Sequence, residues 1–276
     1  MSATIKSYGY FFIALLGLMF FMQASFSEDI RWQASNENNK ASIEHQIWQQ
    51  LLDKYLVSND ASNVNLFAYG KVNKSDKQKL QHYLHKMQAQ TPTQYNKAEQ
   101  KAYWINLYNA LTVQLILDNY PLESITKLGE SLFSFGPWDD DVAVVNGETL
   151  SLNDIEHTIL RPIFTDPRIH YAVNCASFSC PNLSKQAFTA SNTEQLLDKG
   201  ARAYVNHVRG VKIQGDVLKV SSIYHWYIDD FGGDQSSLIK HFKKYASKEL
   251  HKKLTRFEKK NGSLEHDYDW SLNQAK

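Results

Sequence analysis

The chain has 276 residues, of which 30 are lysine or arginine and 29 are aspartate or glutamate, so its formal net charge is +1. This balance excludes the strong basic excess that is typical of general nucleic-acid binders, and we expect no nucleic-acid partner. Two cysteines are too few for a disulfide scaffold, so a hydrophobic core has to stabilise the fold.

Residues 1–27 have the pattern of a secretory signal. Lys6 precedes an uncharged run with an apolar centre at residues 10–22, and the small-residue sequence Ala24-Ser25-Phe26-Ser27 follows. The apolar centre is shorter than the roughly 20 residues of a membrane-spanning helix, although the whole uncharged run is long enough for an uncleaved anchor. We therefore expect a periplasmic or secreted protein that meets the membrane only through this segment, if it is not cleaved.

The rest of the chain divides into three expected parts. Residues 28–95 form an N-terminal linker and helical region, residues 96–235 form the core, and residues 236–276 form basic helices and a tail. The expected fold class is α+β: a helix-rich single domain with short antiparallel β-hairpins around a buried central helix.

In chain order, apolar periodicity predicts helices at residues 43–56 and 76–88, with an extended segment at residues 63–69 between them. The central helix begins at Asn96, because Glu99 follows at capping-box spacing, and it ends before Tyr120-Pro121. Its sequence is apolar nearly all round, which indicates burial.

The second half predicts shorter elements. Asn146-Gly147 supplies the positive φ angles of a tight hairpin turn. A strand at residues 169–173 is expected directly before the segment that contains both cysteines. The other expected elements are a short helix at residues 152–160, a helix at residues 193–208, a hairpin through residues 214–216, an aromatic stretch at residues 223–227, and helices from Ser236 onward.

Both cysteines lie in one short stretch, residues 169–181. Proline favours the first helical position, so Pro181 would place Cys180 at a helix N-cap, where the helix dipole stabilises a thiolate. Cys175 would lie at the end of the predicted strand. A structural disulfide is the simplest alternative in an exported protein, and closing so short a loop would contribute about 2 kcal/mol at most. Inert buried cysteines are a further alternative.

His170 is the expected general base for a cysteine nucleophile. A cysteine activated by a histidine, whose ring a third group orients, is the usual arrangement in thiol hydrolases and acyltransferases. Asn106 and Asn109 lie three residues apart on the central helix, face the same side, and could supply that third group or bind substrate. Alternatively, His170 is a buried histidine hydrogen-bonded to the backbone.

A second polar cluster follows at residues 154–161. Asp154 and His157 are neighbours on one helix face, Glu156 points elsewhere, and Arg161 lies one turn beyond His157. Glu156 and His157 could supply an acid–base pair and Arg161 could hold a substrate carboxylate, but an ion-paired helix is equally consistent with the pattern.

The four residues His157, His170, Cys175 and Cys180 are acceptable zinc ligands. Their spacing matches no compact ligand motif, so we expect neither a metal nor another cofactor. His225, within an aromatic sequence, is a further candidate base. Residues 240–260 hold nine basic and two acidic residues, which indicates a solvated helical face, with contact to an anionic membrane as the lesser alternative.

Four separated sequences resemble the domain of unknown function 547 family, in the order in which its members carry them. They are Tyr103 to Leu111, Asp154 to His157, His170 to Pro181, and Trp226 to Phe231, and Tyr268 to Asn273 is similar to the closing motif of bacterial members. The resemblance extends from about Ala98 to Gly233. It implies no established general activity, and lysine is common in the family where His225 stands here.

The resemblance singles out a polar and reactive set: Trp104, Asn106, Asn109, Glu156, His157, His170, Cys175, Ser179 and Cys180. From the arrangement of His170 and the two cysteines we expect a thiol-dependent hydrolase or acyltransferase acting on a small molecule or peptide. Cys175 is the favoured nucleophile, His170 the base, and Ser179 joins Asn106, Asn109 and Arg161 as substrate-binding residues. The alternatives are a non-catalytic binding module with a Cys175–Cys180 disulfide and a thiol–disulfide redox protein.

Overall fold

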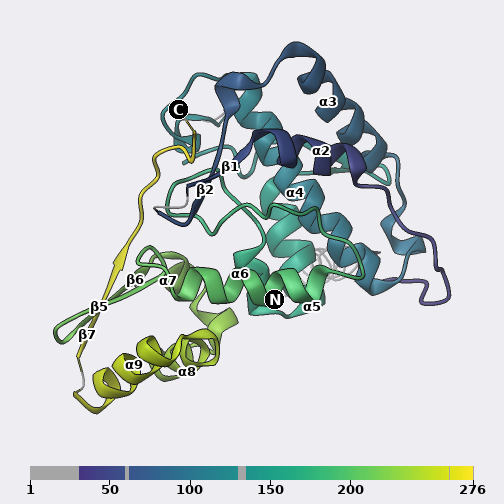
Figure 1. Cartoon of the computed structure of the whole chain (residues 1–276). Coiled ribbons are helices and arrows are strands. Elements are labelled where there is room, and N and C mark those ends of the chain that lie inside the picture. Colours follow the sequence, from purple (N-terminus) through teal and green to yellow (C-terminus); the bar gives the residue numbers. More distant parts are fainter. Residues whose placement is uncertain (1–30, 60–61, 130–134, 261, 276) are drawn as a thin grey trace, which may run out of the picture.

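The computed structural model describes residues 31–59, 62–129, 135–260 and 262–275, and the predicted signal at residues 1–27 lies outside this part of the chain. The fold is α+β and helix-rich, as the sequence predicts (Figure 1). Its longer helices are α2 (Gln46–Tyr55), α3 (Lys74–Gln88), α4 (Lys97–Asn119), α6 (Thr193–Val205), α8 (Gln235–Tyr245) and α9 (Lys248–Lys260), and the short ones are α5 (Arg161–Phe164) and α7 (Ile223–Trp226).

The central helix α4 is confirmed. The side chain of Asn96 accepts a hydrogen bond from the backbone N–H of Glu99 at 3.0 Å and caps the helix, which ends at Asn119, directly before Tyr120-Pro121. Helices α2 and α3 pack beside it (Figure 1). Most of α4 is buried on all sides, including Tyr103 and Trp104, so the larger hydrophobic cluster of the protein forms around this helix.

Three small sheets complete the fold. Strands β1 (Leu56–Asn59) and β2 (Val64–Phe67) pair antiparallel, as do β3 (Ala143–Val145) and β4 (Glu148–Leu150). Asn146 and Gly147 have the positive φ angles predicted for the second hairpin, 52° and 80°. The third sheet has the order β5 (Val211–Gln214), β6 (Val217–Ser221), β7 (Ser263–Asp267), and β7 pairs with β6 in parallel, which the sequence did not indicate.

Two local predictions are wrong. Residues 169–173 are not a strand, because Pro167–Tyr171 forms a 3₁₀-helix that Asp166 caps through the N–H of Arg168 at 3.0 Å. Residues 169–173 are all buried, and an unbroken run of buried residues gives the same sequence pattern in a 3₁₀-helix as in a buried strand. No helix begins at Pro181 either, since residues 181–184 have no regular structure. Cys180 is therefore not a helix N-cap.

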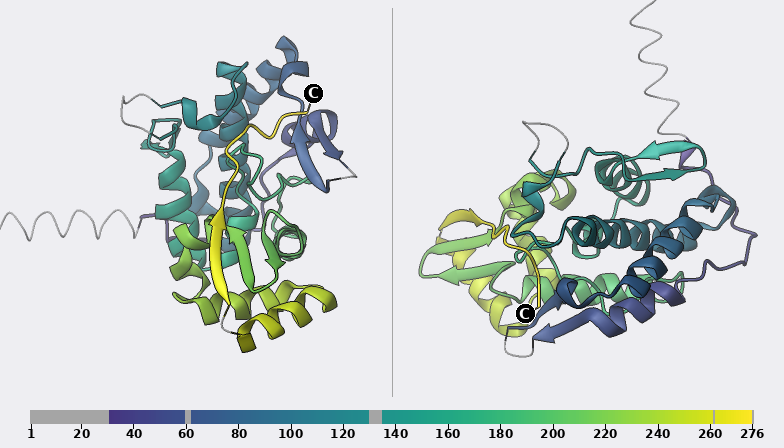
Figure 2. Two further views of the ribbon diagram at one scale, coloured as in Figure 1. Left: turned by 90° about the vertical axis from the view of Figure 1, so that its left-hand side faces the viewer. Right: turned by 90° about the horizontal axis from the view of Figure 1, so that it is seen from above.

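A second, smaller hydrophobic cluster is formed by the end of α6, the sheet β5–β7 and helices α7, α8 and α9. From β7 the chain leaves this cluster, and residues 268–275 run across the protein toward β1 and β2 (Figure 2). Backbone hydrogen bonds fix this C-terminal segment to Phe178, Ser179, Ala176 and Phe67. It therefore links the two clusters.

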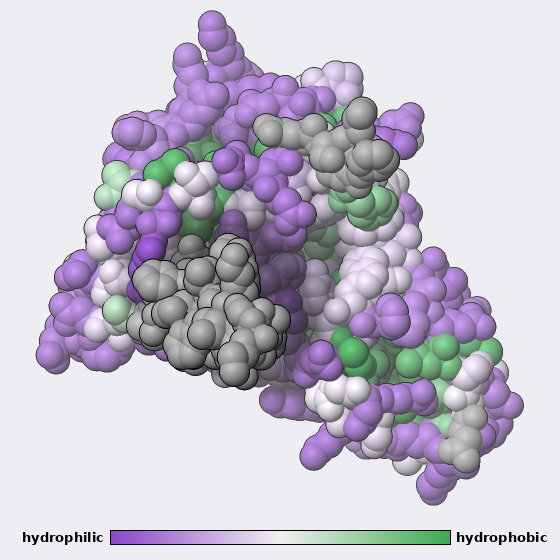
Figure 3. Space-filling model, turned by 180° about the vertical axis from the view of Figure 1, so that it is seen from behind, coloured by the Kyte–Doolittle hydropathy of each residue, from purple (hydrophilic) through white to green (hydrophobic). Residues whose placement is uncertain are grey.

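The surface seen from behind is mostly hydrophilic, with hydrophobic residues appearing on the lobe of β5, β6 and β7 at the lower right (Figure 3). None of the helices in the described part of the chain combines the length and the apolar character that crossing a bilayer requires.

Candidate active site

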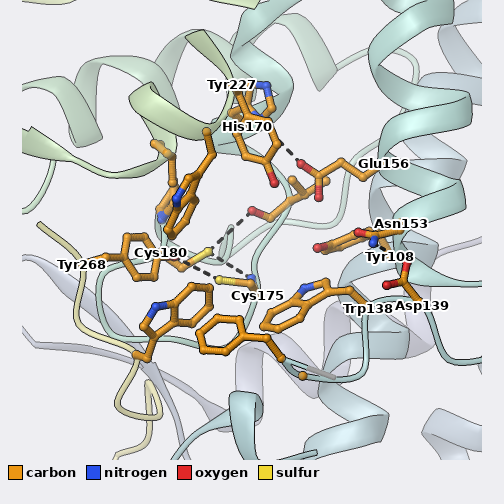
Figure 4. A pocket seen from close by; sticks show the side chains of 17 residues that line it. Tyr108, Trp138, Asp139, Asn153, Glu156, His170, Cys175, Cys180, Tyr227 and Tyr268 are labelled. Atoms are coloured by element: carbon orange, nitrogen blue, oxygen red, sulfur yellow. Dashed lines mark hydrogen bonds and ion pairs between the residues drawn. The ribbon is translucent and has the colours of Figure 1, made fainter. Parts of the chain in front are cut away.

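A cavity of about 390 Å³ lies where residues of both hydrophobic clusters meet (Figure 4). Both cysteines, His170 and Glu156 line it. The remaining lining is largely aromatic and is contributed by α4, the segment before β3, α7 and the C-terminal segment: Tyr108, Phe135, Trp138, Trp226, Tyr227, Tyr268 and Trp270. Reactive and aromatic side chains far apart in the sequence thus share one concave site.

The cysteine loop, residues 174–182, is held in shape by side chains from outside it. Arg209 donates hydrogen bonds to the carbonyl groups of Phe178 and Cys180 and to the side chain of Asn182. Within the loop, the Asn174 side chain donates to the Pro181 carbonyl at 2.7 Å. Because these bonds satisfy the backbone of an irregular loop, the positions of both cysteines are fixed.

Cys175 is surrounded by hydrogen-bond donors. Its Sγ lies 3.1 Å from the Tyr268 hydroxyl and 3.2 Å from the Ser177 hydroxyl. Burial by itself would raise the pKa of Cys175, but hydrogen bonds from Cys180, Ser177 and Tyr268 outweigh it and lower the pKa to about 7. These hydrogen bonds therefore favour the thiolate form of Cys175.

Cys180 has the opposite character. It is buried, and burial together with the neighbouring Cys175 raises the pKa of its thiol well above the usual value. Its Sγ accepts a hydrogen bond from the backbone N–H of Cys175 at 3.0 Å. Both cysteines are free thiols in the structure, so the alternative of a Cys175–Cys180 disulfide is not realised in it. Of the two, Cys175 has the properties of a nucleophile.

The residue after Cys175 has an unusual backbone. Ala176 has a φ of 57°, in the left-handed region that residues with a side chain rarely adopt. The Asn174 side chain accepts a hydrogen bond from the N–H of Ala176 at 3.0 Å and thereby stabilises this turn. Such strain is concentrated at functional sites, where it fixes the direction of a reactive side chain.

His170 lies between two carboxylates on the opposite side of the cavity. Its Nε2 is 2.6 Å from Asp230 Oδ2, and its Nδ1 is 3.5 Å from Glu156 Oε1. Burial would lower the pKa of His170, but the hydrogen bonds with Asp230 and Glu156 outweigh it and raise the pKa. The imidazole also stacks on the Tyr227 ring, with centroids 4.3 Å apart. Both ring nitrogens thus face carboxylates.

Arg161 extends this network away from the cavity. Its guanidinium donates two hydrogen bonds to the carboxylate of Asp230, at 2.6 and 3.0 Å, and lies 3.0 Å from His157 Nδ1. It also lies over the Tyr227 ring, 4.8 Å from the centroid. Arg161 and His157 line a different surface depression from the cysteines. Burial lowers the pKa of His157, which favours its neutral form.

Glu156 lines the cavity from a helical turn that is not α-helical. Asp154–Leu160 is π-helical, and the N–H of Arg161 donates to the carbonyl of Glu156, five residues back. Such turns often occur at functional sites. Burial would raise the pKa of Glu156, but the His170 and Tyr108 hydrogen bonds and nearby histidine charges lower it. Glu156 and His157 point in different directions: Glu156 lines the cavity with the cysteines, and His157 lines the depression with Arg161.

Asn106 and Asn109 face one side of α4, as predicted, and both side chains bind backbone. Asn106 donates to the carbonyl of Phe188 and accepts from its N–H, at 2.8 and 2.9 Å. Asn109 donates to the carbonyl of Ala172 and accepts from the N–H of Asn174, at 2.9 and 2.8 Å. Neither contacts His170, but Asn109 fixes the chain that leads into the cysteine loop.

Other predicted residues also have structural partners. The Ser179 hydroxyl accepts a hydrogen bond from the N–H of Asp269 at 2.8 Å and secures the C-terminal segment. His225 lies beside His266, with ring centroids 4.9 Å apart, and does not line the cavity. Among the described residues, no three His, Cys, Asp or Glu side chains are placed to hold a metal ion, so the zinc quartet is not assembled.

Sequence reasoning missed the aromatic walls. Trp138, Trp226 and Trp270 come from three separate segments. The local pattern of Trp138 does not distinguish it from a core aromatic, and the motifs that contain Trp226 and Trp270 do not by themselves indicate that these indoles line a cavity. Tyr268 had a signal, because it begins the closing motif at residues 268–273, but its contact with Cys175 depends on the path of the C-terminal segment.

The comparisons with known proteins concern the middle of the chain. Residues 92–205 match the family model described as "Protein of unknown function, DUF547". No curated protein and no solved structure matches the chain. The match contains α4, the π-helical turn, His170 and both cysteines, whereas Trp226, Asp230 and Tyr268 lie beyond it. The resemblance predicted from the sequence is thus confirmed over residues 92–205, which match the domain of unknown function 547 family.

Proposed function

We propose that the protein is a thiol-dependent acyl-transfer enzyme, a hydrolase or acyltransferase, in which Cys175 is the nucleophile. The observation that carries the proposal is the environment of this thiol. Hydrogen bonds lower its pKa to about 7 while its sulfur lines a cavity large enough for a small molecule or a peptide side chain.

In this mechanism the Cys175 thiolate attacks an acyl carbonyl and forms a carbon–sulfur bond. The tetrahedral intermediate collapses to a thioester, and the leaving group departs with a proton. Glu156 transfers that proton to the leaving group and takes it from His170 Nδ1, which lies 3.5 Å from Glu156 Oε1, because both side chains line the same cavity. The raised pKa of His170 favours the protonated form that this step uses.

Water or an acceptor then attacks the thioester. The proton of the attacking group passes through Glu156 back to His170, which is neutral at this stage, and the Cys175 thiolate is released. Asp230 and Arg161 orient the imidazole throughout, since Asp230 lies 2.6 Å from its Nε2 and Arg161 binds Asp230. Asn106, Asn109 and Ser179 are positioning residues in this scheme rather than substrate ligands.

The proposal includes a location outside the cytoplasm. It rests on the signal pattern of residues 1–27. In an oxidising compartment the two thiols can form a disulfide. The oxidation state of the two cysteines in protein purified from that compartment therefore distinguishes this enzyme from a binding module with a permanent disulfide.

The test is capture of the acyl-enzyme. Wild-type protein is incubated with 4-nitrophenyl esters and thioesters of short acyl chains, quenched in acid, and measured by intact-mass spectrometry. We expect one acyl adduct on Cys175, none in Cys175→Ala, and a retained adduct in Cys180→Ser, the matched control in the same loop. Equal ester turnover by wild type and Cys175→Ala, without an adduct, would refute the proposal.

Thiol counting completes the test. Alkylation with and without reductant gives the number of free thiols in protein purified from the culture. Two free thiols support the enzyme. A bridge that resists reduction would favour the binding module, and a bridge in rapid exchange with glutathione would favour the redox protein.

A further inference from the structure

Four aromatic side chains surround the part of the cavity next to Cys175, and we call them the aromatic cage: Trp138, Trp226, Tyr268 and Trp270. Tyr268 ties the cage to the reactive sulfur, because its hydroxyl lies 3.1 Å from Cys175 Sγ. The cage is accessible, since Trp226 is 45% exposed and the other three are partly exposed.

The rings of the cage face the cavity from different directions. Trp270 meets Trp138 at 66° and Tyr268 at 51°, and Trp226 meets Tyr268 at 54°, with centroid separations of 4.5 to 5.5 Å. Only Trp226 and Trp270 are near parallel, at 26°. A sugar ring usually stacks on one open aromatic face. Several aromatic faces turned toward the same part of a cavity create there the negative potential that attracts a cation.

One wall of the cage depends on a glycine. Gly136 has a φ of 91°, and a Cβ there would lie 1.8 Å from a carbon of the Trp138 ring. The absence of a side chain at this position lets the indole fold back over the chain. The orientation of Trp138 is therefore built into the local sequence.

Carboxylates outnumber basic groups in the lining. Asp139 is exposed beside Trp138, and its carboxylate accepts a hydrogen bond from Asn153 at 2.6 Å. Glu156 lies deeper and is balanced by His170. None of the lining residues in the described part of the chain is lysine or arginine. An anionic substrate would meet Asp139 and the Cys175 thiolate, whereas the imidazole of His170 is already paired with Glu156 and Asp230.

We propose that the cavity selects a substrate that carries an ammonium group, primary or quaternary, bound in the aromatic cage with Asp139 near its mouth. This rests on the proposed function, because it names the substrate class of the same site. The acyl carbonyl attacked by Cys175 and the ammonium group then belong to one molecule, and the cage holds the cationic end beside the thiol.

The test compares two probes of nearly equal shape, choline and the neutral 3,3-dimethylbutan-1-ol, by calorimetric titration of the full protein. A cation–π contact contributes from about 0.5 kcal/mol at an exposed site to about 2 kcal/mol at a desolvated one, so we expect choline to bind about two- to thirtyfold more tightly. Trp226→Ala should abolish most of this preference, and Trp226→Phe should retain part of it. Trp226 is exposed enough for either variant to fold.

The contribution of the Asp139 carboxylate to choline binding is tested with a matched pair of variants. Asp139→Asn should weaken choline binding several-fold, whereas Asp141→Asn, an exposed aspartate outside the lining, should leave it unchanged. Equal or tighter binding of the neutral probe would overturn the proposal, and so would saturable binding of N-acetylglucosamine without binding of choline.

Cys175→Ser separates this inference from the proposed function. The variant should lose acyl-enzyme formation and keep the preference for choline. Loss of the preference in a wild-type protein that still forms the acyl-enzyme would refute the ammonium site alone. A preference for choline in a protein that never forms an acyl-enzyme would refute the thiol mechanism and leave an ammonium-binding module.

Discussion

Tyr268 connects the C-terminal segment to the chemistry of Cys175. Its hydroxyl lies 3.1 Å from the sulfur and 2.9 Å from the Ser177 hydroxyl, so it belongs to a chain of donors that stabilises a thiolate. Burial raises the pKa of Tyr268 itself well above the usual value, which keeps the phenol protonated and able to donate.

Tyr268→Phe should raise the pKa of Cys175. A hydrogen bond to a charged group contributes about 1.5–3 kcal/mol, so losing it should shift the pH midpoint of thiolate formation upward by about one pH unit or more. The measurement is the rate of iodoacetamide alkylation of Cys175 between pH 5 and pH 10, with Cys180→Ser as background. Tyr227→Phe is the control, because Tyr227 lines the cavity and no hydrogen bond joins it to the sulfur. Equal midpoints in both variants would contradict the role of Tyr268.

Asp230 holds two cations at once. It lies 2.6 Å from His170 Nε2 and binds Arg161 through both oxygens. Burial by itself would raise the pKa of Asp230, but the hydrogen bonds from His170 and Arg161 lower it well below the usual range. Removing one partner of such a network leaves the others partly buried and unpaired.

Asp230→Asn should therefore destabilise the fold by about 2 kcal/mol, toward the low end for a buried ion pair because its side chain is 25% exposed. Urea unfolding monitored by tryptophan fluorescence measures the change. Asp229→Asn, the adjacent aspartate on the same 3₁₀-helix, should change stability by less than about 0.5 kcal/mol. A larger loss in Asp229→Asn than in Asp230→Asn would show that the network is not the stabilising feature.

At the scale of elements, the C-terminal segment carries two walls of the cavity, Tyr268 and Trp270, and is fixed by backbone bonds to the cysteine loop. Ser179 adds a side-chain bond, since its hydroxyl accepts from the N–H of Asp269. The loop and the segment therefore position each other, and loosening one should disturb the thiol held by the other.

Ser179→Ala should lower stability by about 1 kcal/mol and move the alkylation midpoint of Cys175 upward by less than Tyr268→Phe does. Ser271→Ala, on the same segment, should leave both quantities unchanged, because Ser271 contacts the loop through its carbonyl. An unchanged midpoint together with a weakened substrate affinity in Ser179→Ala would favour direct substrate binding instead.

The elements differ in how far the sequence could predict them. Helix α4 was predictable because Asn96 caps it locally and Pro121 ends it. Residues 169–173 were not, because continuous burial looks alike in a strand and in a 3₁₀-helix. The parallel pairing of β7 with β6 joins residues more than 40 positions apart in the sequence, which no local pattern encodes.

The same distinction applies to the site. His170, Cys175 and Glu156 stood out by residue type, and the structure brings them to one cavity. Their partners could not be read from type, since the donors to Cys175 include Tyr268, and His170 faces Asp230 rather than an asparagine. These contacts depend on where α7 and the C-terminal segment pack against the loop.

At the scale of the whole molecule, the cavity lies between two hydrophobic clusters, and a charged network spans that junction. The network pairs Glu156 from the π-helical turn and Asp230 from the segment after α7 with His170, while Arg161 binds Asp230. The pKa of His170 is raised, whereas the pKa values of Glu156 and Asp230 are lowered. The stability of the junction should therefore depend on pH in both directions.

A group whose pKa is raised by folding stabilises the fold below its unfolded pKa, about 6.5 for histidine, and this contribution disappears as the pH rises through the folded pKa. The lowered carboxylates stabilise the fold above about pH 4.5 and lose this contribution as the pH falls. The network should thus contribute most between about pH 5 and pH 6.5.

The variant His170→Gln, which cannot ionise, isolates the contribution of His170 to the unfolding free energy, because other titrating groups such as His157 and His241 remain in both proteins. The difference in unfolding free energy between wild type and His170→Gln, measured in urea from pH 4 to pH 9, should be largest in that window and shrink above it. A difference that is constant across this range would mean that His170 stabilises the junction by packing on Tyr227 and not by its charge.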